Sequence, residues 1–151
     1  MALSVLTGVF TNKGRELLAN SFGNFATGVT TRARYFKYGE GGFIQQAGGR
    51  IPKDPSDGVS LLDIEAESDA LLFAFQKNLV TTDFTFIAPS IMQCRCRLVE
   101  LEANANVSGD PPRFFEIGIF DDLDNMLIYT TFSEQTKTAT KILSNFIQVQ
   151  F

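Results

Sequence analysis

The side chains able to do acid–base or metal chemistry are few and poorly arranged for catalysis. The chain has 151 residues and no histidine, which removes the commonest general base, the Ser-His-Asp arrangement and most transition-metal sites. Glu100 and Glu102 share one face of an expected strand. Glu65, Glu67 and Asp69 form a second group of acidic residues. They lie in a segment whose periodicity does not decide between a helix and an extended chain. No carboxylate pair is placed across a cleft, as glycoside hydrolysis needs. We therefore expect no enzyme and no cofactor.

Cys94 and Cys96 lie in the segment IMQCRCRLVEL. Residues two apart in a strand point to the same face, so both thiols should join Met92 and Leu98 on one apolar face. This spacing favours small buried hydrophobes, because a disulfide between neighbours in an extended strand would be strained. An intersubunit disulfide is the alternative, once the protein has left the reducing cytosol. The absence of histidine and the single intervening residue do not fit a zinc site.

The sequence DDLDN, residues 121–125, could offer carboxylate and amide oxygens to calcium. Its spacing does not match an EF-hand loop, which needs a glycine at its sixth position and a distal glutamate. Aspartate and asparagine also favour the backbone conformations of tight turns. The sequence therefore predicts a solvated hairpin turn without a metal ion, in which Asp124→Ala has little effect on stability.

Residues 39–58 concentrate the residues that interrupt regular structure. They include Gly39, Gly41, Gly42, Gly48, Gly49, Pro52, Pro55 and Gly58. We expect an extended loop or arm with no regular element. No Gly-Lys-Ser/Thr follows the GEGG sequence, so it is not a phosphate-binding loop. A connection this long is usually functional or flexible. We expect it to reach a neighbouring subunit, with Phe43, Ile44, Arg50 and Ile51 as the candidate contact.

The composition describes an ordered and mildly acidic protein. Hydrophobic residues make up 44% of the chain, and the net charge is −4. Basic residues are scattered, apart from the spaced trio Arg32, Arg34 and Lys37, which argues against a nucleic-acid partner. No apolar run approaches the roughly 18 residues of a membrane span. The first ten residues have no basic leader, so we expect no signal peptide and synthesis in a cytoplasm.

Periodicity and turn signals place one helix and several short strands. The helix is expected over Arg15–Phe22, with Thr11 or Asn12 as its cap. Strands are expected at residues 30–38, 71–80, 83–88, 91–101, 114–120, 126–132 and 142–151. Phe115, Ile117 and Ile119 should alternate inward, and residues 133–141 should form a polar connection.

This pattern predicts a mainly β fold: an antiparallel β-sandwich with one short N-terminal helix and a long Gly/Pro-rich loop. The expected organisation is a single domain over residues 1–151. Within it, residues 1–25 form an N-terminal helical segment, residues 39–58 the extended loop or arm, and residues 71–151 the sandwich core.

Two segments resemble parts of a known virion family. FFEIGIF, the DDLDN turn, MLIYTTF and the Lys-Thr-rich link to the last strand resemble the C-terminal half of phage tail-fibre anchoring (tail-collar fibre) domains and related baseplate proteins. YFKYGEGGF resembles the strand-and-loop motif of the same domains, and TNKGRELLA resembles their N-terminal helix. The resemblance covers Tyr35–Phe43 and Phe114–Phe132, and extends loosely to the helix and the last strand.

The resemblance implies a bacteriophage virion structural protein of the tail, made in the host cytoplasm. It would be a baseplate or tail-fibre adaptor, because the chain stops at Phe151 where fibre proteins continue into a shaft. Its expected partners are other virion tail proteins and further copies of itself, in threefold or sixfold symmetry, with no nucleic acid and no membrane span. The alternatives are a neck or capsid-associated structural protein, and a carbohydrate-binding β-sandwich for host recognition. The absence of tryptophan counts against the latter.

Overall fold

The computed structural model describes residues 2–23, 32–54, 75–106 and 108–151. These residues are mainly strand with one helix, which confirms the coarse prediction. The first elements are β1 (Ala2–Thr7), β2 (Val9–Phe10), α1 (Asn12–Gly23), β3 (Tyr35–Gly39), β4 (Phe43–Gln46) and β5 (Gly49–Pro52). The later ones are β6 (Phe75–Asn78), the short 3-10 helix η2 (Thr81–Asp83), β7 (Phe84–Ala88), β8 (Ile91–Leu98), β9 (Arg113–Phe120), β10 (Met126–Thr136) and β11 (Leu143–Gln150). Residues 60–70, for which the sequence did not decide between a helix and an extended chain, lie outside the described residues.

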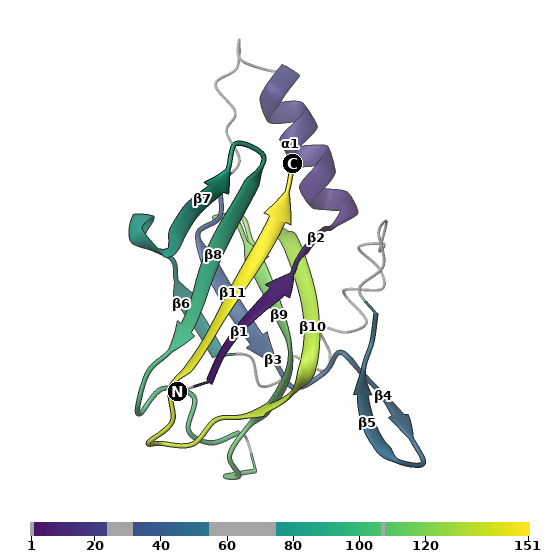
Figure 1. Ribbon diagram of the computed structural model, residues 1–151, viewed down its shortest axis with the longest axis vertical. Helices are drawn as coiled ribbons and strands as arrows, with labels where there is room; N and C mark the ends of the chain where they lie inside the picture. The colour runs from purple at the N-terminus through teal and green to yellow at the C-terminus, as the bar shows by residue number, and fades with distance from the viewer. Residues whose placement is uncertain (1, 24–31, 55–74, 107) are drawn as a thin grey trace.

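The strands form two larger sheets and one separate hairpin (Figure 1). The four-stranded sheet has the order β1-β11-β8-β7, the five-stranded sheet has the order β2-β10-β9-β3-β6, and β4 pairs with β5. The predicted antiparallel pairing is wrong at one position, because β1 runs parallel to β11 from Ala2–Leu143 to Thr7–Gln148. Neither β1 nor β2 was predicted. Both find their partners, β11 and β10, near the other end of the sequence, where local patterns give no signal.

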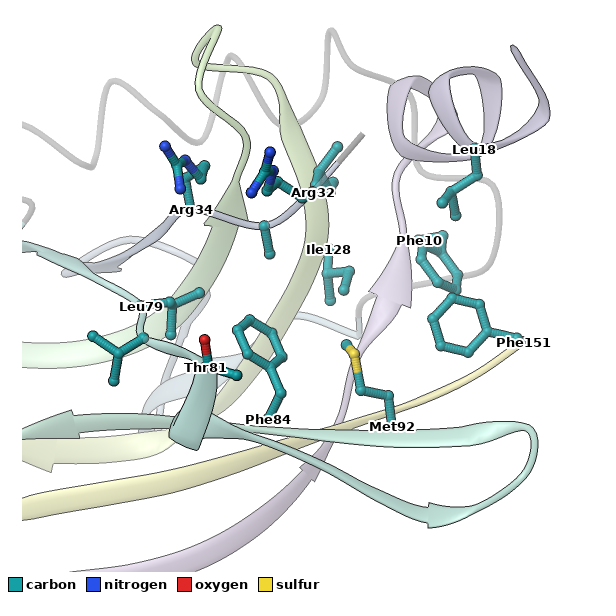
Figure 2. A pocket seen from close by; sticks show the side chains of 13 residues that line it. Phe10, Leu18, Arg32, Arg34, Leu79, Thr81, Phe84, Met92, Ile128 and Phe151 are labelled. Carbon is teal, nitrogen blue, oxygen red and sulfur yellow. The ribbon is translucent and has the colours of Figure 1, made fainter. Parts of the chain in front are cut away.

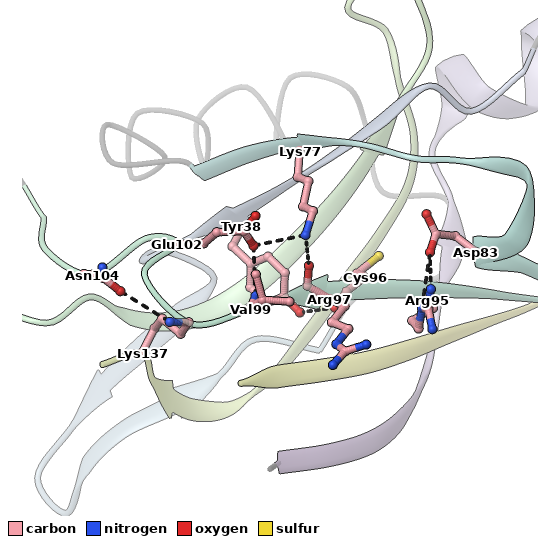
Figure 3. Close-up of polar contacts among 10 residues, drawn as sticks. All are labelled: Tyr38, Lys77, Asp83, Arg95, Cys96, Arg97, Val99, Glu102, Asn104 and Lys137. Atoms are coloured by element: carbon pink, nitrogen blue, oxygen red, sulfur yellow. Dashed lines mark hydrogen bonds and ion pairs between the residues drawn. The ribbon is translucent and has the colours of Figure 1, made fainter. Parts of the chain in front are cut away.

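Side chains from the two larger sheets share one buried core. The four-stranded sheet contributes Cys94, Cys96, Leu98, Leu143, Ile147 and Val149, and the five-stranded sheet contributes Phe36, Tyr38, Phe114, Ile117, Ile119, Ile128 and Phe132. Polar contacts also cross between the sheets (Figure 3). The Tyr38 hydroxyl donates to the Cys96 carbonyl at 2.7 Å, and Lys77 Nζ donates to the Arg97 carbonyl at 3.2 Å. Burial and these bonds together fix how the sheets face each other.

The predicted alternation along β9 is partly wrong. Ile117 and Ile119 belong to the shared core, but the third member from this strand is Phe114 and not Phe115. Phe115 is also buried, yet its ring lies 5.0 Å from the ring of Phe43 on β4. The pairing of β9 with β10 is irregular between Thr131 and Gln135. An irregularity of this kind re-aims side chains, so a strict period of two fails here.

The connection predicted at residues 133–141 is shorter than expected, because β10 continues to Thr136. Gln135 pairs with Phe114 across the sheet, and its side-chain amide donates to Asn145 Oδ1 at 3.0 Å. The side chain of Gln135 at this strand end is thus held by a partner in the other sheet. In the same sheet, β3 begins at Tyr35, whereas the strand was predicted over residues 30–38. Residues 30 and 31 lie outside the described residues.

Of the two caps that the sequence left open for α1, Thr11 and Asn12, the structure has Thr11. Thr11 Oγ1 accepts the backbone amide of Gly14 at 2.8 Å and donates to the Met126 carbonyl at 2.5 Å. Thr11 therefore caps the helix and ties it to β10 at once. Gly14 packs directly against the Leu127 backbone, and a Cβ at this position would collide with the Leu127 carbonyl oxygen. Close approach of helix to strand explains a glycine where helix propensity disfavours it.

The two cysteines are free thiols on the core face of β8, and neither is exposed to solvent. Burial raises the pKa of the Cys96 thiol well above its ordinary value, so it stays protonated and unreactive. The prediction that they act as small buried hydrophobes is confirmed.

We expect the double variant Cys94→Ala/Cys96→Ala to remain folded and to lose about 1–3 kcal/mol of stability, since two small side chains leave little cavity. Urea unfolding with the wild type as reference measures this. Cys94→Ser/Cys96→Ser should lose more, because it buries two hydroxyls. A covalent multimer on non-reducing gels of assembled particles would contradict the assignment.

Candidate functional site

Part of the segment expected to lack regular structure is a β-hairpin, so that prediction is wrong over residues 43–52. β4 and β5 pair antiparallel through a two-residue connection, Ala47-Gly48, with Ile44 opposite Ile51 and Gln45 opposite Arg50. Within the hairpin, the glycines and the proline that suggested a loop stand where a hairpin tolerates them. Pro55 and Gly58 lie outside the described residues. Gly49 has a φ of +122° next to the turn, and Pro52 ends the second strand.

The hairpin projects from the side of the two larger sheets (Figure 1). Its tip and most of its length are exposed. Ile44 and Ile51 are 48% and 45% exposed, and as direct cross-strand partners they form one apolar pair facing solvent. A pair of exposed isoleucines on a projecting strand is unusual enough to suggest a contact surface.

The four predicted contact residues lie together on the hairpin, but on two faces. Because strand side chains alternate, Phe43 and Arg50 lie opposite the isoleucine pair. Phe43 packs on buried Phe115, and the Arg50 guanidinium carbon lies 4.6 Å above the Phe43 ring. Of these four residues, only Ile44 and Ile51 are therefore free to bury apolar surface against another protein. That they form a subunit contact stays a prediction.

The base of the hairpin is fixed to the five-stranded sheet. The Lys53 amide donates to the Gly42 carbonyl at 2.8 Å, and the Thr131 hydroxyl on β10 donates to the Lys53 carbonyl. Gly42 has a φ of +78°, and a Cβ there would approach the Glu116 carboxylate at 2.9 Å. These contacts hold the hairpin in one orientation, which lowers the entropy that docking would cost.

A buried carboxyl group lies directly under this base. Glu116 on β9 is completely buried, and its Oε2 accepts the Tyr129 hydroxyl at 2.5 Å. Its Oε1 makes no hydrogen bond within the part of the chain that the structure describes. Burial raises the pKa of Glu116 from 4.5 to about 7, and the Tyr129 hydrogen bond only partly opposes that rise. Near neutral pH the group therefore changes charge under the hairpin.

Glu116 and Tyr129 were not singled out from the sequence. One signal was available, since Glu116 is the single charged residue within the apolar run FFEIGIF. An isolated carboxylate in a strand whose neighbours are all apolar is rarely exposed, and a buried one needs a partner. The identity of that partner depends on the β9–β10 register, which the sequence does not reveal.

A cavity of about 360 Å³ lies beside the hairpin. It is lined by Glu40, Phe43, Arg50, Asn106, Asp110, Pro111 and Arg113. Glu40 Oε1 accepts the Arg113 backbone amide at 2.8 Å, which ties the start of the hairpin segment to the start of β9. Two acidic and two basic side chains line this cavity, so it favours no particular ligand charge.

The turn between β9 and β10 holds its carboxylates in internal bonds. Asp121 Oδ1 accepts the amides of Leu123 and Asn125, each at 2.9 Å, and Asp121 Oδ2 accepts the Asn125 side-chain amide at 3.0 Å. Asp124 accepts the hydroxyl of buried Tyr35. No cluster of three or more metal-ligating side chains was found within the described ranges. The oxygens that could bind calcium instead fix the turn.

Asp124 should matter more than its place in a turn suggests, because its φ is +62° and it binds Tyr35. We expect Asp124→Ala to cost about 2 kcal/mol, combining a lost hydrogen bond with the strain of a left-handed alanine. Asp124→Asn, which tolerates this φ, should cost less than half as much. Thermal melting with calcium and with chelator should give the same curve. A calcium-dependent rise in Tm that Asp124→Ala removes would contradict this account.

A second cavity, of about 390 Å³, opens at the end of the molecule that carries α1 and the C-terminus (Figures 1 and 2). Its walls come from both larger sheets, from α1 and from the segment leading into β3. The apolar lining is Phe10, Leu18, Ala33, Leu79, Val80, Phe84, Met92, Leu127, Ile128 and Phe151. Thr81, Arg32 and Arg34 complete it. Figure 2 shows both arginines on one side of the cavity, across from Phe84 and Met92.

The three spaced basic residues have different roles here. Lys37 Nζ lies 4.8 Å above the Phe120 ring, and Arg34 pairs with Asp122 at 3.5 Å. Arg32 is exposed and makes no ion pair or hydrogen bond with any residue in the described ranges. The trio therefore does not form one basic patch, and Arg32 alone is left to meet an anionic group.

Within the described residues, no helix is long and apolar enough to cross a membrane. Compared with known proteins, the chain matches no family model, no curated protein and no solved structure.

Proposed function

We propose that this chain is a structural protein of a bacteriophage tail, a baseplate or tail-fibre adaptor that binds neighbouring virion proteins and further copies of itself. The observation that carries the proposal is the projecting β4–β5 hairpin with its exposed Ile44–Ile51 pair. It directly follows Tyr35–Phe43, one of the two segments whose sequence resembles tail-fibre anchoring domains, and shares Phe43 with it. A rigid apolar projection is the kind of surface that an adaptor protein can insert into a neighbouring protein.

The body of the molecule suits the same task. We infer a β-sandwich whose shared core and inter-sheet hydrogen bonds make it a firm support. The hairpin is attached to this support through the hydrogen bond between Thr131 and Lys53. The expected arrangement is threefold or sixfold, with the hairpin of each copy reaching a neighbour in the tail. A contact between one surface patch and a different patch on the next subunit gives such a ring when the rotation between subunits closes.

The first test locates the protein. Mass spectrometry of purified virions should detect the chain, and negative-stain imaging of antibody-labelled particles should place the label on the tail. A label on the neck or head would replace the tail assignment with a neck or capsid-associated one. Absence of the chain from purified virions would refute the proposal.

The second test addresses the hairpin directly. We expect Ile44→Asp/Ile51→Asp to abolish capture of tail proteins from a lysate of infected cells, because it places two charges in an apolar contact. The matched control is Phe86→Asp/Ile87→Asp, which makes the same change at two exposed apolar residues of β7. The control should capture tail proteins as the wild type does. Equal losses in both variants would refute a specific role of the hairpin.

A further inference from the structure

The turn between β9 and β10 presents an exposed leucine on a rigid backbone. Leu123 is 81% exposed, and hydrogen bonds within the turn fix its backbone. Its amide donates to Asp121 Oδ1 at 2.9 Å, and the Asp121 amide donates to the Asn125 carbonyl at 3.1 Å. A backbone held in this way loses little conformational freedom on binding, so the leucine that it presents suits insertion into a pocket. The exposed Asp122 stands next to it.

The cavity of about 390 Å³ next to α1, here called the end cavity, complements this projection in shape and charge. Its walls are apolar, and part of the surrounding surface is exposed, with Val80 at 57% and Phe151 at 59%. The arginines mark the rim, and Arg32 has no partner in the part of the chain that the structure describes. An occupant that complements this site must be apolar where it enters and negatively charged beside Arg32.

The projection and the end cavity lie side by side at one end of the molecule. Arg34 connects them, because it lines the cavity and also pairs with Asp122 at 3.5 Å. We propose that two copies of this chain dock through this end, with Leu123 of each inserted into the cavity of the other. In that arrangement the carboxylate of Asp122 meets Arg32 of the second copy.

The argument for a second copy is charge complementarity within one surface. A carboxylate has room for several donors, so Asp122 can keep Arg34 of its own chain and accept Arg32 of the other. Because each copy carries one projection and one end cavity next to each other, a twofold axis satisfies both contacts at once. The hairpin lies away from this end, so the contact does not depend on the proposed function of the hairpin (Figure 1).

Sedimentation of the full chain over a concentration series tests the contact. We expect Leu123→Ser to weaken dimerisation about tenfold or more, as loss of a central apolar anchor does. The matched control is Leu101→Ser, which changes another leucine that is 78% exposed and should leave dimerisation unchanged. Both positions are exposed, so circular dichroism should show the same fold in each variant. A wild type that stays monomeric at every concentration would overturn the proposal, as would equal effects of the two variants.

A charge exchange tests the pairing of Arg32 with Asp122. Arg32→Glu and Asp122→Arg should each weaken self-association about tenfold, because each places like charges at both copies of the contact. Mixing the two variants in equal amounts should restore it, since both contacts of the mixed dimer are then attractive. Lys141→Glu and Asp110→Arg are the controls for charge alone. If the mixture associates no better than either variant, the proposed contact is refuted.

Cross-linking distinguishes this docking mode from other self-association. A mixture of Val80→Cys and Leu123→Cys chains should form a disulfide-linked dimer under mild oxidation, while Leu123→Cys alone should form far less. The native cysteines do not interfere, because both are buried. Ile44→Asp/Ile51→Asp, which tests the hairpin, should leave the cross-link unchanged. Cross-linking of Leu123→Cys to itself in preference to Val80→Cys would overturn insertion into the cavity.

Discussion

Ile117→Asp is expected to leave the chain unfolded at 25 °C. Ile117 is fully buried on β9, which has β3 on one side and β10 on the other. An unpaired aspartate in this position costs several kcal/mol or must take up a proton, and the cavity left by isoleucine adds to the cost. The sum approaches the roughly 5–15 kcal/mol that stabilises an ordinary domain.

Circular dichroism and one-dimensional proton NMR measure this outcome. The matched control is Ile87→Asp on the edge strand β7, where the isoleucine is 51% exposed. The control should fold and change stability by less than about 1 kcal/mol. A folded Ile117→Asp protein with nearly wild-type stability would show that β9 does not lie at the centre of the fold.

Raising the pH from 4.5 to 7.5 should destabilise the wild type relative to Glu116→Gln by about 3 kcal/mol. Burial raises the folded-state pKa of Glu116 from 4.5 to about 7. Between these values the folded state holds a proton that the unfolded state has lost, so stability is full below pH 4.5 and falls as pH rises through 7. The size follows from about 1.4 kcal/mol for each pKa unit.

Denaturant unfolding of both proteins at a series of pH values gives this difference, and the glutamine variant cancels the contribution of every other carboxyl group. Tyr129→Phe should move the transition to higher pH, because the Tyr129 hydrogen bond favours the ionised carboxyl group. Parallel stability curves for wild type and Glu116→Gln would show that Glu116 is ionised throughout and that its pKa is not raised.

The location of Glu116 gives this titration a structural meaning. The carboxyl group lies under the glycines that lead into the hairpin, and Gly42 has no room for a side chain above it. Ionisation therefore adds an incompletely hydrogen-bonded charge at the point where the hairpin joins the sheet. The base of the hairpin is the region where loss of stability at higher pH should appear first, and amide hydrogen exchange can follow it.

Local patterns in the sequence were sufficient for the strands with regular alternation. In IMQCRCRL every second residue is apolar, and Cys94, Cys96 and Leu98 are all fully buried on one face. The cap at Thr11 was also predictable, because its hydroxyl acts on an amide three residues away. In these places the structure depends on neighbours in the sequence, and the pattern contains the required information.

Features that depend on distant residues were not predicted. Nothing near β1 indicates that it will pair with β11. The choice between Phe114 and Phe115 depends on an irregular register with β10, and a shift of one residue exchanges the two faces of a strand. At the candidate site, the exposed residues of the hairpin were named from composition, but its two faces follow only from the Ile44–Ile51 register.

The pairing of β1 with β11 also determines when the four-stranded sheet can be completed during synthesis. β1 leaves the ribosome before any other described element, and its partner is translated about 140 residues later. At roughly 5–20 residues per second, this interval lasts about 7–30 seconds. In the later part of that time β8 has already been translated, and the edge of β8 that pairs with β11, its main neighbour in the sheet, is still unpaired. Folding is therefore delayed until β11 has been translated, and a ribosome that stalls before β11 leaves a chain prone to aggregation.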